Sequence, residues 1–571
     1  MNTSLVKDLN QNTLKRDVIA GLTLFVMLIP QGMAYAMLAG LPPVMGLYAS
    51  TIPLFIYALL GSSKHLSVGP VAITSLLVFS GVSVYAEPGS ALYLSLVIVL
   101  AMMVGVIQLL FGLFKLGFIV KFIPYSVMNG YTSAAAIIIG ISQLKHLLGV
   151  ELGNYLQIHL LLFEVFRRVQ DIALLPLILG LGCVAFLIVM KRWFPKIPAA
   201  LVVVIISIAI VYLFRLDQQQ LQIVGAIPNG FPGFSFPQIS INSVTMLAPM
   251  ALTIALLGFM ESLSIGKTVA RKEKYDVRPN QEFKALGLSN IIGSCFSSFP
   301  VNGSFSRTAV NYQAGGATQL TTIITGLCVM ITVALFTSVF YYLPNAALAA
   351  IIMVAVYKLV DIQEMRHLFK VKKFEGWIWV ATFFTTLFVG IQWGIILGAV
   401  FTLLLVIKRS AKPNVVQLGY VTKEKTFRDV KRYPEAIISE KVAVLRIDSS
   451  LHFANVSFIE GKVKQVVQSD LTDWLIMEMS GVNDVDTFSI QRLEELLDFY
   501  EKQGVTVLFS NLKGSVRDTV NKVGWQEKYT HHQNHLTLEQ LLREKGIRSY
   551  FDPSYQYKSL KKEEKLYDFM I

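Results

Sequence analysis

Long apolar runs recur from Val18 to Ile407 and alternate with short polar connections. A helix of about 20 apolar residues matches the hydrocarbon thickness of a bilayer, where the backbone must satisfy its own hydrogen bonds. With 54% hydrophobic residues, the chain is more apolar than ordinary soluble domains. We therefore expect a polytopic α-helical membrane protein with about 14 spans in two sets of about seven. The first two runs end near residues 38 and 61, the third begins near 69, and the others lie at about 91–114, 119–144, 172–190, 197–214, 244–266, 284–298, 304–314, 318–341, 345–360, 375–390 and 392–408.

The third run of each set begins with a short broken segment, at residues 67–72 and 302–308. Paired interruptions at matching places in two halves indicate an inverted-repeat transporter with its site near the middle of the membrane. Proline is favoured in the first turn of a helix, so Pro70 predicts a helix start near Gly69. A further break, at residues 30–32, is expected to interrupt the first run.

The segment at residues 302–308 has the chemistry of an anion site. The first N–H groups of a helix lack internal partners and lie at the positive end of its dipole. Ser304 and Ser306 add hydroxyl donors, and Arg307 adds a permanent positive charge with a planar set of donors. An arginine at membrane depth is costly unless it faces a cavity or a partner. The alternative is that Arg307 lies at a helix end and extends to the interface.

Glu261 stands in an otherwise apolar helix, and a carboxylate there is a candidate site for proton or sodium coupling. Its alternative role is a structural ion pair with Arg307 or Lys267. Polar groups also occur in the apolar runs at Gln31, Tyr35 and Tyr131. Gln31 follows the proline break and is expected to line the site, whereas tyrosines such as Tyr35 also belong to interfacial belts.

The positive charge of the chain, +13 overall, lies mainly in alternate loops of the apolar region. This asymmetry follows the positive-inside rule and places both termini in the cytoplasm. It also favours membrane loops over nucleic-acid binding as the reason for the charge. Cys183, Cys295 and Cys328 lie in apolar segments, which indicates small packed residues and no disulfide framework.

The composition changes after residue 411, where charged residues become common and apolar runs shorten. We expect a transmembrane domain over 1–411, a cytoplasmic α/β domain over 412–550 and a polar tail over 551–571. Expected strands lie at 442–447, 474–479 and 505–509, and expected helices at 457–467, 489–502, 515–523 and 537–544.

Motifs for enzyme chemistry are weak. Gly266-Lys267-Thr268 resembles the end of a phosphate-binding loop, but Glu261 occupies the place of its first glycine and no strand precedes it. His531, His532 and His535 have metal-like spacing without a placed partner, so a solvated turn is favoured. We expect no catalytic residues, no metal and no cofactor.

The segments 30–36, 42–48, 67–72 and 304–307 together resemble the sulfate permease family (SulP, the solute carrier 26 anion transporters), and the C-terminal part is similar to its STAS domain. The resemblance covers nearly the whole chain and implies a seven-plus-seven repeat with core and gate domains. It implies an anion between the two half-helix N-termini. Its members move sulfate, bicarbonate, chloride or dicarboxylates, commonly as dimers. The implied binding residues are Gln31, Tyr35, Gly69, Pro70, Val71, Ala72, Ser304, Phe305, Ser306 and Arg307.

Two departures from the family bear on coupling. The resemblance gives Glu261 a role in cation coupling, but Ile265 and Ala72 stand where a sodium-coupled bicarbonate member carries hydroxyl groups. Loss of oxygen ligands disfavours sodium and favours protons.

In the STAS domain, Thr487 occupies the place of a phosphorylatable serine in related regulators, and we expect it to cap the following helix.

These observations lead to the hypothesis of a proton-coupled symporter of sulfate or a similar oxyanion that works by alternating access. It would be a multi-pass protein of the plasma membrane, with both termini cytoplasmic, and a homodimer. Two alternatives stay open. One keeps the fold but moves or exchanges bicarbonate, chloride or a dicarboxylate, and the other is a membrane-tethered STAS regulatory protein.

Overall fold

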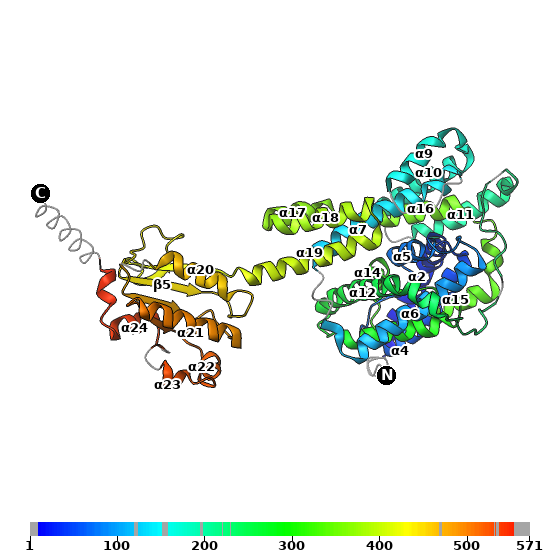
Figure 1. Cartoon of the computed structure of the whole chain (residues 1–571). Coiled ribbons are helices and arrows are strands. Elements are labelled where there is room, and N and C mark those ends of the chain that lie inside the picture. Colours follow the sequence, from blue (N-terminus) through cyan, green and yellow to red (C-terminus); the bar gives the residue numbers. More distant parts are fainter. Residues whose placement is uncertain are drawn as a thin grey trace, which may run out of the picture. The chain divides into compact units, whose positions relative to one another are not determined.

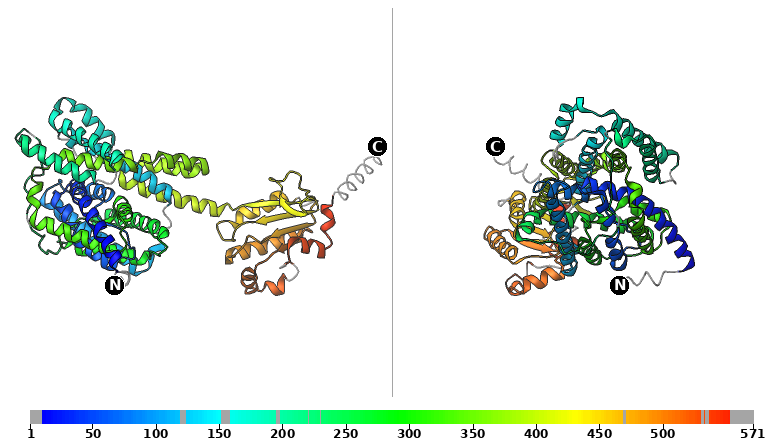
Figure 2. Two further views of the ribbon diagram at one scale, coloured as in Figure 1. Left: turned by 180° about the vertical axis from the view of Figure 1, so that it is seen from behind. Right: turned by 90° about the vertical axis from the view of Figure 1, so that its right-hand side faces the viewer.

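The structure is a computed structural model, and it describes residues 10–118, 124–150, 158–194, 198–219, 221–228, 230–467, 471–529, 532 and 536–552. The chain divides into two compact units, Met1–Thr402 and Leu403–Ile571. The first is a helix bundle and the second a small sheet covered by helices (Figures 1 and 2).

The first half of the bundle follows the predicted apolar runs. Its elements are α2 (Gln11–Leu38), α3 (Pro43–Tyr48), α4 (Ile52–Leu60), β1 (Val68–Gly69), α5 (Ala72–Val82), α6 (Ala91–Leu113), α7 (Tyr125–Ser142), α8 (Leu144–Leu148), α9 (Ile158–Arg167), η2 (Val169–Asp171), α10 (Leu174–Trp193), α11 (Ala199–Phe214) and η3 (Leu216–Gln218).

The second half repeats this order of long and broken helices. Its elements are α12 (Ile241–Lys272), α13 (Pro279–Ser294), β2 (Asn302–Gly303), α14 (Phe305–Gln313), α15 (Leu320–Leu335), η4 (Thr337–Phe340), α16 (Asn345–Val356), η5 (Tyr357–Leu359), α17 (Ile362–Val371), α18 (Lys373–Phe388) and α19 (Ile391–Ala411). Within the described residues, seven helical segments are long and apolar enough to cross a membrane, and four further apolar helices are shorter.

Within the described residues, helices occupy all the predicted runs, but two local predictions were wrong. The helix α2 continues through Pro30 without interruption, because a proline removes only one donor and α3, α14, α15 and α16 pack around this helix. The helix α5 begins at Ala72 and not near Gly69, because Val68 and Gly69 form a strand. The loops between spans also contain two amphipathic helices, α9 and α17.

The second unit has a five-stranded sheet in the order β4-β3-β5-β6-β7. The strands are β3 (Val415–Val421), β4 (Thr426–Asp429), β5 (Val442–Ile447), β6 (Trp474–Glu478) and β7 (Thr506–Ser510), and the helices are α20 (Val456–Val466), α21 (Thr487–Lys502), α22 (Gly514–Asn521), α23 (Trp525–Lys528), α24 (Leu538–Glu544) and η6 (Arg548–Phe551). One face of the sheet packs against α20, α21 and α22, and the other packs against α24. The three predicted strands and four predicted helices are present, while β3, β4 and α23 were missed.

Candidate functional site

The two broken segments meet in the interior of the bundle. The strands β1 and β2 pair antiparallel, with Val68 opposite Gly303 and Gly69 opposite Asn302. The pairing continues at one end, where the backbone N–H of Ser304 donates to the carbonyl of Ser67 at 2.9 Å. The N–H of Ser67 in turn donates to the hydroxyl of Thr308 at 3.0 Å. Each short strand leads directly into a helix, so the N-termini of α5 and α14 are held close together.

Local sequence explains why both helices start here. Gly69 has a φ of +149°, which side chains rarely tolerate, and an added Cβ would lie 3.2 Å from Nη2 of Arg307. Ser304 is the N-cap of α14, and its hydroxyl accepts from the N–H of Arg307 at 3.5 Å. The start of α5 has Val71 as N-cap and no side-chain cap, which leaves its first N–H groups without that partner.

Arg307 lies between the two tips and is fully buried. Its Nη1 donates to the carbonyl of Pro70 at 2.8 Å, and its Nε donates to the hydroxyl of Ser67 at 3.4 Å. Its Nη2 is buried and has no hydrogen-bond partner among the described residues. The guanidinium therefore joins the two segments with two nitrogens and keeps one nitrogen with unused donors beside Gly69.

The other predicted residues surround this centre to different degrees. Gln31 and Tyr35 of α2 are buried, and Oε1 of Gln31 has no hydrogen-bond partner among the described residues. Pro70, Val71 and Ala72 are buried as well. By contrast, Phe305 and Ser306 are exposed, although the hydroxyl of Ser306 lies 3.3 Å from that of Ser304.

Glu261 of α12 belongs to the same neighbourhood. Its carboxylate interacts electrostatically with Arg307, Tyr35 and Tyr131, and the hydroxyl of Tyr131 is buried without a described partner. Glu261 and Arg307, both described, form no direct ion pair. The carboxylate thus shares the field of the guanidinium without being neutralised by contact.

The turn that carries Glu261 is docked onto β2. The hydroxyl of Ser262 donates to the carbonyl of Gly258 at 2.5 Å and accepts from the N–H of Gly303 at 2.8 Å. The side chain of Asn302 packs on Gly258, where a Cβ would meet its Nδ2 at 2.0 Å, and Nδ2 donates to Thr74 of α5 at 2.9 Å. These contacts tie α12, β2 and α5 together.

Sequence reasoning assigned no role to the residues that build this frame, namely Ser67, Thr74, Ser262, Asn302 and Thr308, although Ser67, Asn302 and Thr308 lie in the two predicted segments. The signal available was an unusual density of small polar residues in apolar runs, which must find partners when buried in lipid.

The same signal applies to two buried carboxylates. Asp17 accepts from N–H groups of Ala317 and Thr318 at the start of α15, and Glu282 accepts from Tyr57, Ser62 and Ser63. Both hold helix or loop ends.

Two predictions concern the second unit. The prediction that Thr487 caps α21 was wrong, because Asp486 is the N-cap and accepts from the N–H of Ser489 at 2.8 Å, while Thr487 is the first helical residue and is exposed. His531 and His535 lie outside the described residues. Nδ1 of His532 lies 2.6 Å from the carbonyl oxygen of Val507, and its Nε2 lies 2.8 Å from Oε1 of Glu501. Both contacts are structural.

Comparison with known proteins identifies both units. The model of the sulfate permease family matches residues 14–382, and that of the STAS domain matches residues 433–539. The chain is 36% identical to the chloroplastic sulfate transporter 4.1 of Arabidopsis thaliana, over 90% of this chain and 77% of that protein. It is 32% identical to the low affinity sulfate transporter 3 of Stylosanthes hamata, over 91% of this chain and 87% of that protein.

The fold is also similar to solved transporters. The structure of murine solute carrier 26 family member A9, an anion transporter in the inward-facing state, aligns with a TM-score of 0.88 at 28% identity and covers 95% of this chain and 93% of that chain. The transmembrane domain of a cyanobacterial bicarbonate transporter aligns with a TM-score of 0.59 at 23% identity, over 69% of this chain and 98% of that chain, and shares the fold alone. The chain therefore belongs to the sulfate permease (solute carrier 26) family: it is an integral multi-pass membrane protein that transports anions and carries a C-terminal STAS domain.

Proposed function

We propose that this protein is a symporter that couples the movement of sulfate, or a similar inorganic oxyanion, to protons by alternating access. The observation that carries this proposal is Arg307, a buried guanidinium at the meeting point of two helix N-termini with Nη2 unused by described residues. Positive helix ends and a guanidinium favour a tetrahedral oxyanion, which accepts several hydrogen bonds at once. The names of the plant relatives, which are sulfate transporters, support the same substrate.

In this proposal the anion is bound by Nη2 of Arg307 and by the first N–H groups of α5 and α14. Ser304 and Ser306 lie at the start of α14, and Gly69, Pro70, Val71 and Ala72 form the approach to α5. Gln31, Tyr35 and Phe305 complete the surroundings. No cofactor or metal takes part.

Glu261 carries the proton. Its carboxylate lies in the field of Arg307 without a direct ion pair, so its charge affects how well the same pocket holds a dianion. Protonation of Glu261 removes one negative charge near the site and makes loading of sulfate less repulsive. A neutral Glu261 and a bound anion then favour each other, which is the basis of symport.

The test is an anion panel in proteoliposomes with imposed gradients. Labelled sulfate should enter faster when the outside is acidic, and an imposed sodium gradient at constant pH should have no effect. Bicarbonate, chloride and fumarate, added separately, measure by competition whether one of them replaces sulfate as the substrate. Uptake that follows sodium, or that requires a counter-anion inside at every pH, would refute proton symport.

A variant that lacks residues 413–571 separates transport from regulation. If the STAS domain only modulates a working transporter, this variant retains saturable sulfate uptake. We also propose that both termini lie in the cytoplasm, on the basis of the basic loops. The resemblance to a family whose members are commonly dimers supports a homodimer, which we place in the plasma membrane. Cysteine accessibility from each side of intact cells tests the orientation, and light scattering of the purified protein tests the dimer.

A further inference from the structure

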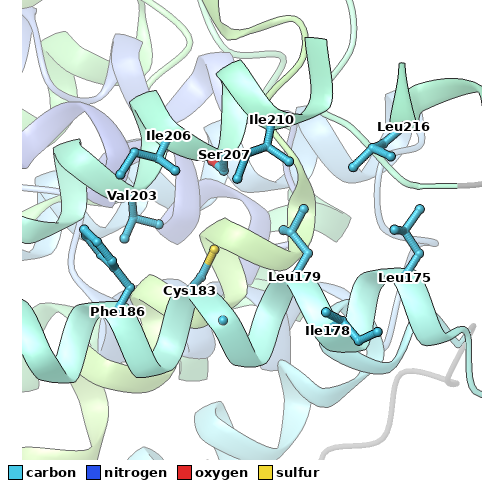
Figure 3. A pocket seen from close by; sticks show the side chains of 11 residues that line it. Leu175, Ile178, Leu179, Cys183, Phe186, Val203, Ile206, Ser207, Ile210 and Leu216 are labelled. Atoms are coloured by element: carbon cyan, nitrogen blue, oxygen red, sulfur yellow. The ribbon is translucent and has the colours of Figure 1, made fainter. Parts of the chain in front are cut away.

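A groove of about 410 Å³ lies between α10 and α11 (Figure 3), and its lining residues are different from those of the site described above. Leu175, Leu179 and Phe186 line it from α10, and Val203, Ile206 and Ile210 line it from α11. The side chains of the two helices point toward one another across the groove (Figure 3). The only hydroxyl in its lining, that of Ser207, donates to the carbonyl of Val204 at 3.0 Å. Among the described residues of the lining, only the weak thiol donor of Cys183 is then left for a polar ligand.

The groove belongs to the lipid-facing side of the bundle. Only 17% of the apolar stretch of α10 is buried inside the protein. Its large side chains Leu174, Ile178, Leu181 and Ile188 are exposed. In a membrane protein, lipid acyl chains cover such a surface, because the hydrocarbon core of the bilayer contains no water. A hollow in this surface is therefore filled by lipid hydrocarbon.

The length of the groove matches one acyl chain. From Leu175 to Phe186 the helix advances about 16 Å at 1.5 Å per residue. This is about half of the 30 Å hydrocarbon core of a bilayer, which is the depth of one leaflet. A chain that enters at one end therefore runs along the whole groove and reaches the middle of the membrane.

Two residues of opposite charge flank Leu216, which lines one end of the groove. Leu216 lines the groove and is flanked in sequence by Arg215 and Asp217. Arg215 is exposed and caps α11 in the left-handed conformation, with a φ of +49°. Neither Arg215 nor Asp217 forms an ion pair with any residue that the structure describes. A cation and an anion next in sequence to a residue that lines the apolar groove can pair with the phosphate and ammonium groups of a zwitterionic headgroup.

We propose that this groove binds a phosphatidylethanolamine-type lipid, with one acyl chain between α10 and α11, its phosphate at Arg215 and its ammonium group at Asp217. The ammonium of ethanolamine donates hydrogen bonds to a carboxylate, which the methylated ammonium of choline cannot do. The bound lipid fills the space between two helices that both pack against α16. It therefore stabilises this side of the bundle.

Gly182 provides a substitution that blocks the groove without disturbing the helix packing. It lines the groove, and a Cβ added there would have nothing within 4 Å, so Gly182→Leu places a side chain in the space of the acyl chain. Gly140 of α7 is a matched control, because it also has nothing within 4 Å of an added Cβ and does not line the groove. The full-length protein is delipidated in detergent, phosphatidylethanolamine is added, and bound lipid is counted by native mass spectrometry.

The proposal predicts that wild-type protein and Gly140→Leu retain one lipid molecule per chain, whereas Gly182→Leu loses it. Replacing Arg215 by Gln should weaken retention about fivefold, the factor for one basic residue at a lipid phosphate. Arg192→Gln, an exposed change near the other end of α10, should leave retention unchanged. Equal lipid binding by Gly182→Leu and Gly140→Leu would overturn the groove as the site.

Cys183 gives an independent measurement, because it lines the groove while Cys328 lies on α15. Alkylation by an apolar maleimide should be slowed by phosphatidylethanolamine at Cys183 and unchanged at Cys328. Phosphatidylcholine and phosphatidylglycerol should protect Cys183 less. Equal protection by all three lipids would refute the headgroup assignment. Protection that appears without lipid and follows the formation of dimers would mean that a second copy of the chain covers the groove, and would refute a lipid site.

Discussion

We assign two separable roles to Arg307, and substituting it by lysine distinguishes them. Nη1 and Nε hold Pro70 and Ser67, while Nη2 is the donor that we assign to the anion. A lysine keeps the positive charge but cannot bond in three directions from a planar group. Hydrogen bonds to charged groups contribute about 1.5–3 kcal/mol each, so Arg307→Ala, which removes both described bonds, should cost about 3–6 kcal/mol of stability. Arg307→Lys should keep part of this stability but lose the planar arrangement of donors.

The effect on binding follows from the same arithmetic. Losing one charge-assisted hydrogen bond of about 2 kcal/mol to sulfate weakens binding about 30-fold. We therefore expect Arg307→Lys to raise the Kd for sulfate by about that factor, and Arg307→Ala to abolish detectable binding. Scintillation proximity with labelled sulfate measures the Kd. Thermal unfolding without sulfate measures the stability loss separately, and Arg271→Lys on the exposed end of α12 is the control.

Ligand-induced stabilisation decides between the two roles. A ligand at 100 times its Kd stabilises the folded state by about 2.7 kcal/mol, so saturating sulfate should raise the Tm of the wild type measurably. If Arg307→Lys unfolds at a lower temperature yet binds sulfate with an unchanged Kd, then Arg307 only braces the two segments, and the assignment of Nη2 to the anion is wrong.

Three further substitutions test Glu261, the packing of α12 on β2 and the cap of α21. Glu261→Gln should retain sulfate binding but lose the stimulation of uptake by an acidic exterior, and uptake that still follows the pH gradient would remove its coupling role. Gly258→Ala places a methyl group 2.0 Å from the amide nitrogen of Asn302 and should lower the Tm, whereas Gly140→Ala, in open space, should leave it unchanged. Asp486→Ala removes the N-cap of α21 at a cost of about 1 kcal/mol and should speed hydrogen exchange in its first turn, with no change in sulfate Kd.

The cap at Asp486 also has a defined pH dependence. Burial raises the pKa of this carboxyl, but hydrogen bonds from Ser489 and Phe453 outweigh burial and leave the pKa below its ordinary value. A folded-state pKa that lies below the unfolded one contributes stability above the unfolded pKa, and this stability is lost as the pH falls through the folded pKa. Protection of the first turn of α21 should therefore be constant near neutral pH and decrease only in strong acid.

The sequence predicted where the apolar helices lie, because the bilayer imposes a length and an apolar composition that can be read locally. It predicted Ser304 as a helix start because capping is also local. It failed at Pro30, where the packing of neighbouring helices maintains a helix that the proline alone would weaken. It failed at Thr487 because two adjacent residues could cap α21, and only the backbone decides that Asp486 does so.

The contacts of Arg307 could not be predicted from the local sequence. The pairing of Val68 with Gly303 joins segments more than 200 residues apart, and neither segment contains a sequence signal that identifies its partner. The spacing of the two interruptions predicted that both lie near the site, but not that they form one antiparallel ladder. The two small strands are therefore the feature that the structure adds to the sequence argument.

This ladder limits how the protein can open its site to the two sides of the membrane. Separating the tips of α5 and α14 would break the bonds of Ser304 and Ser67 and those of Arg307, and in an apolar interior these groups would have no replacement partners. Ser262 and Asn302 fix α12 to the same ladder. We therefore expect α5, α12 and α14 to move together with the anion, so that access changes where this group packs against other helices. Hydrogen exchange at the amides of Ser67 and Ser304 should therefore stay equally slow when the protein is trapped open to either side, and fast exchange in one of the two states would show that the tips must separate.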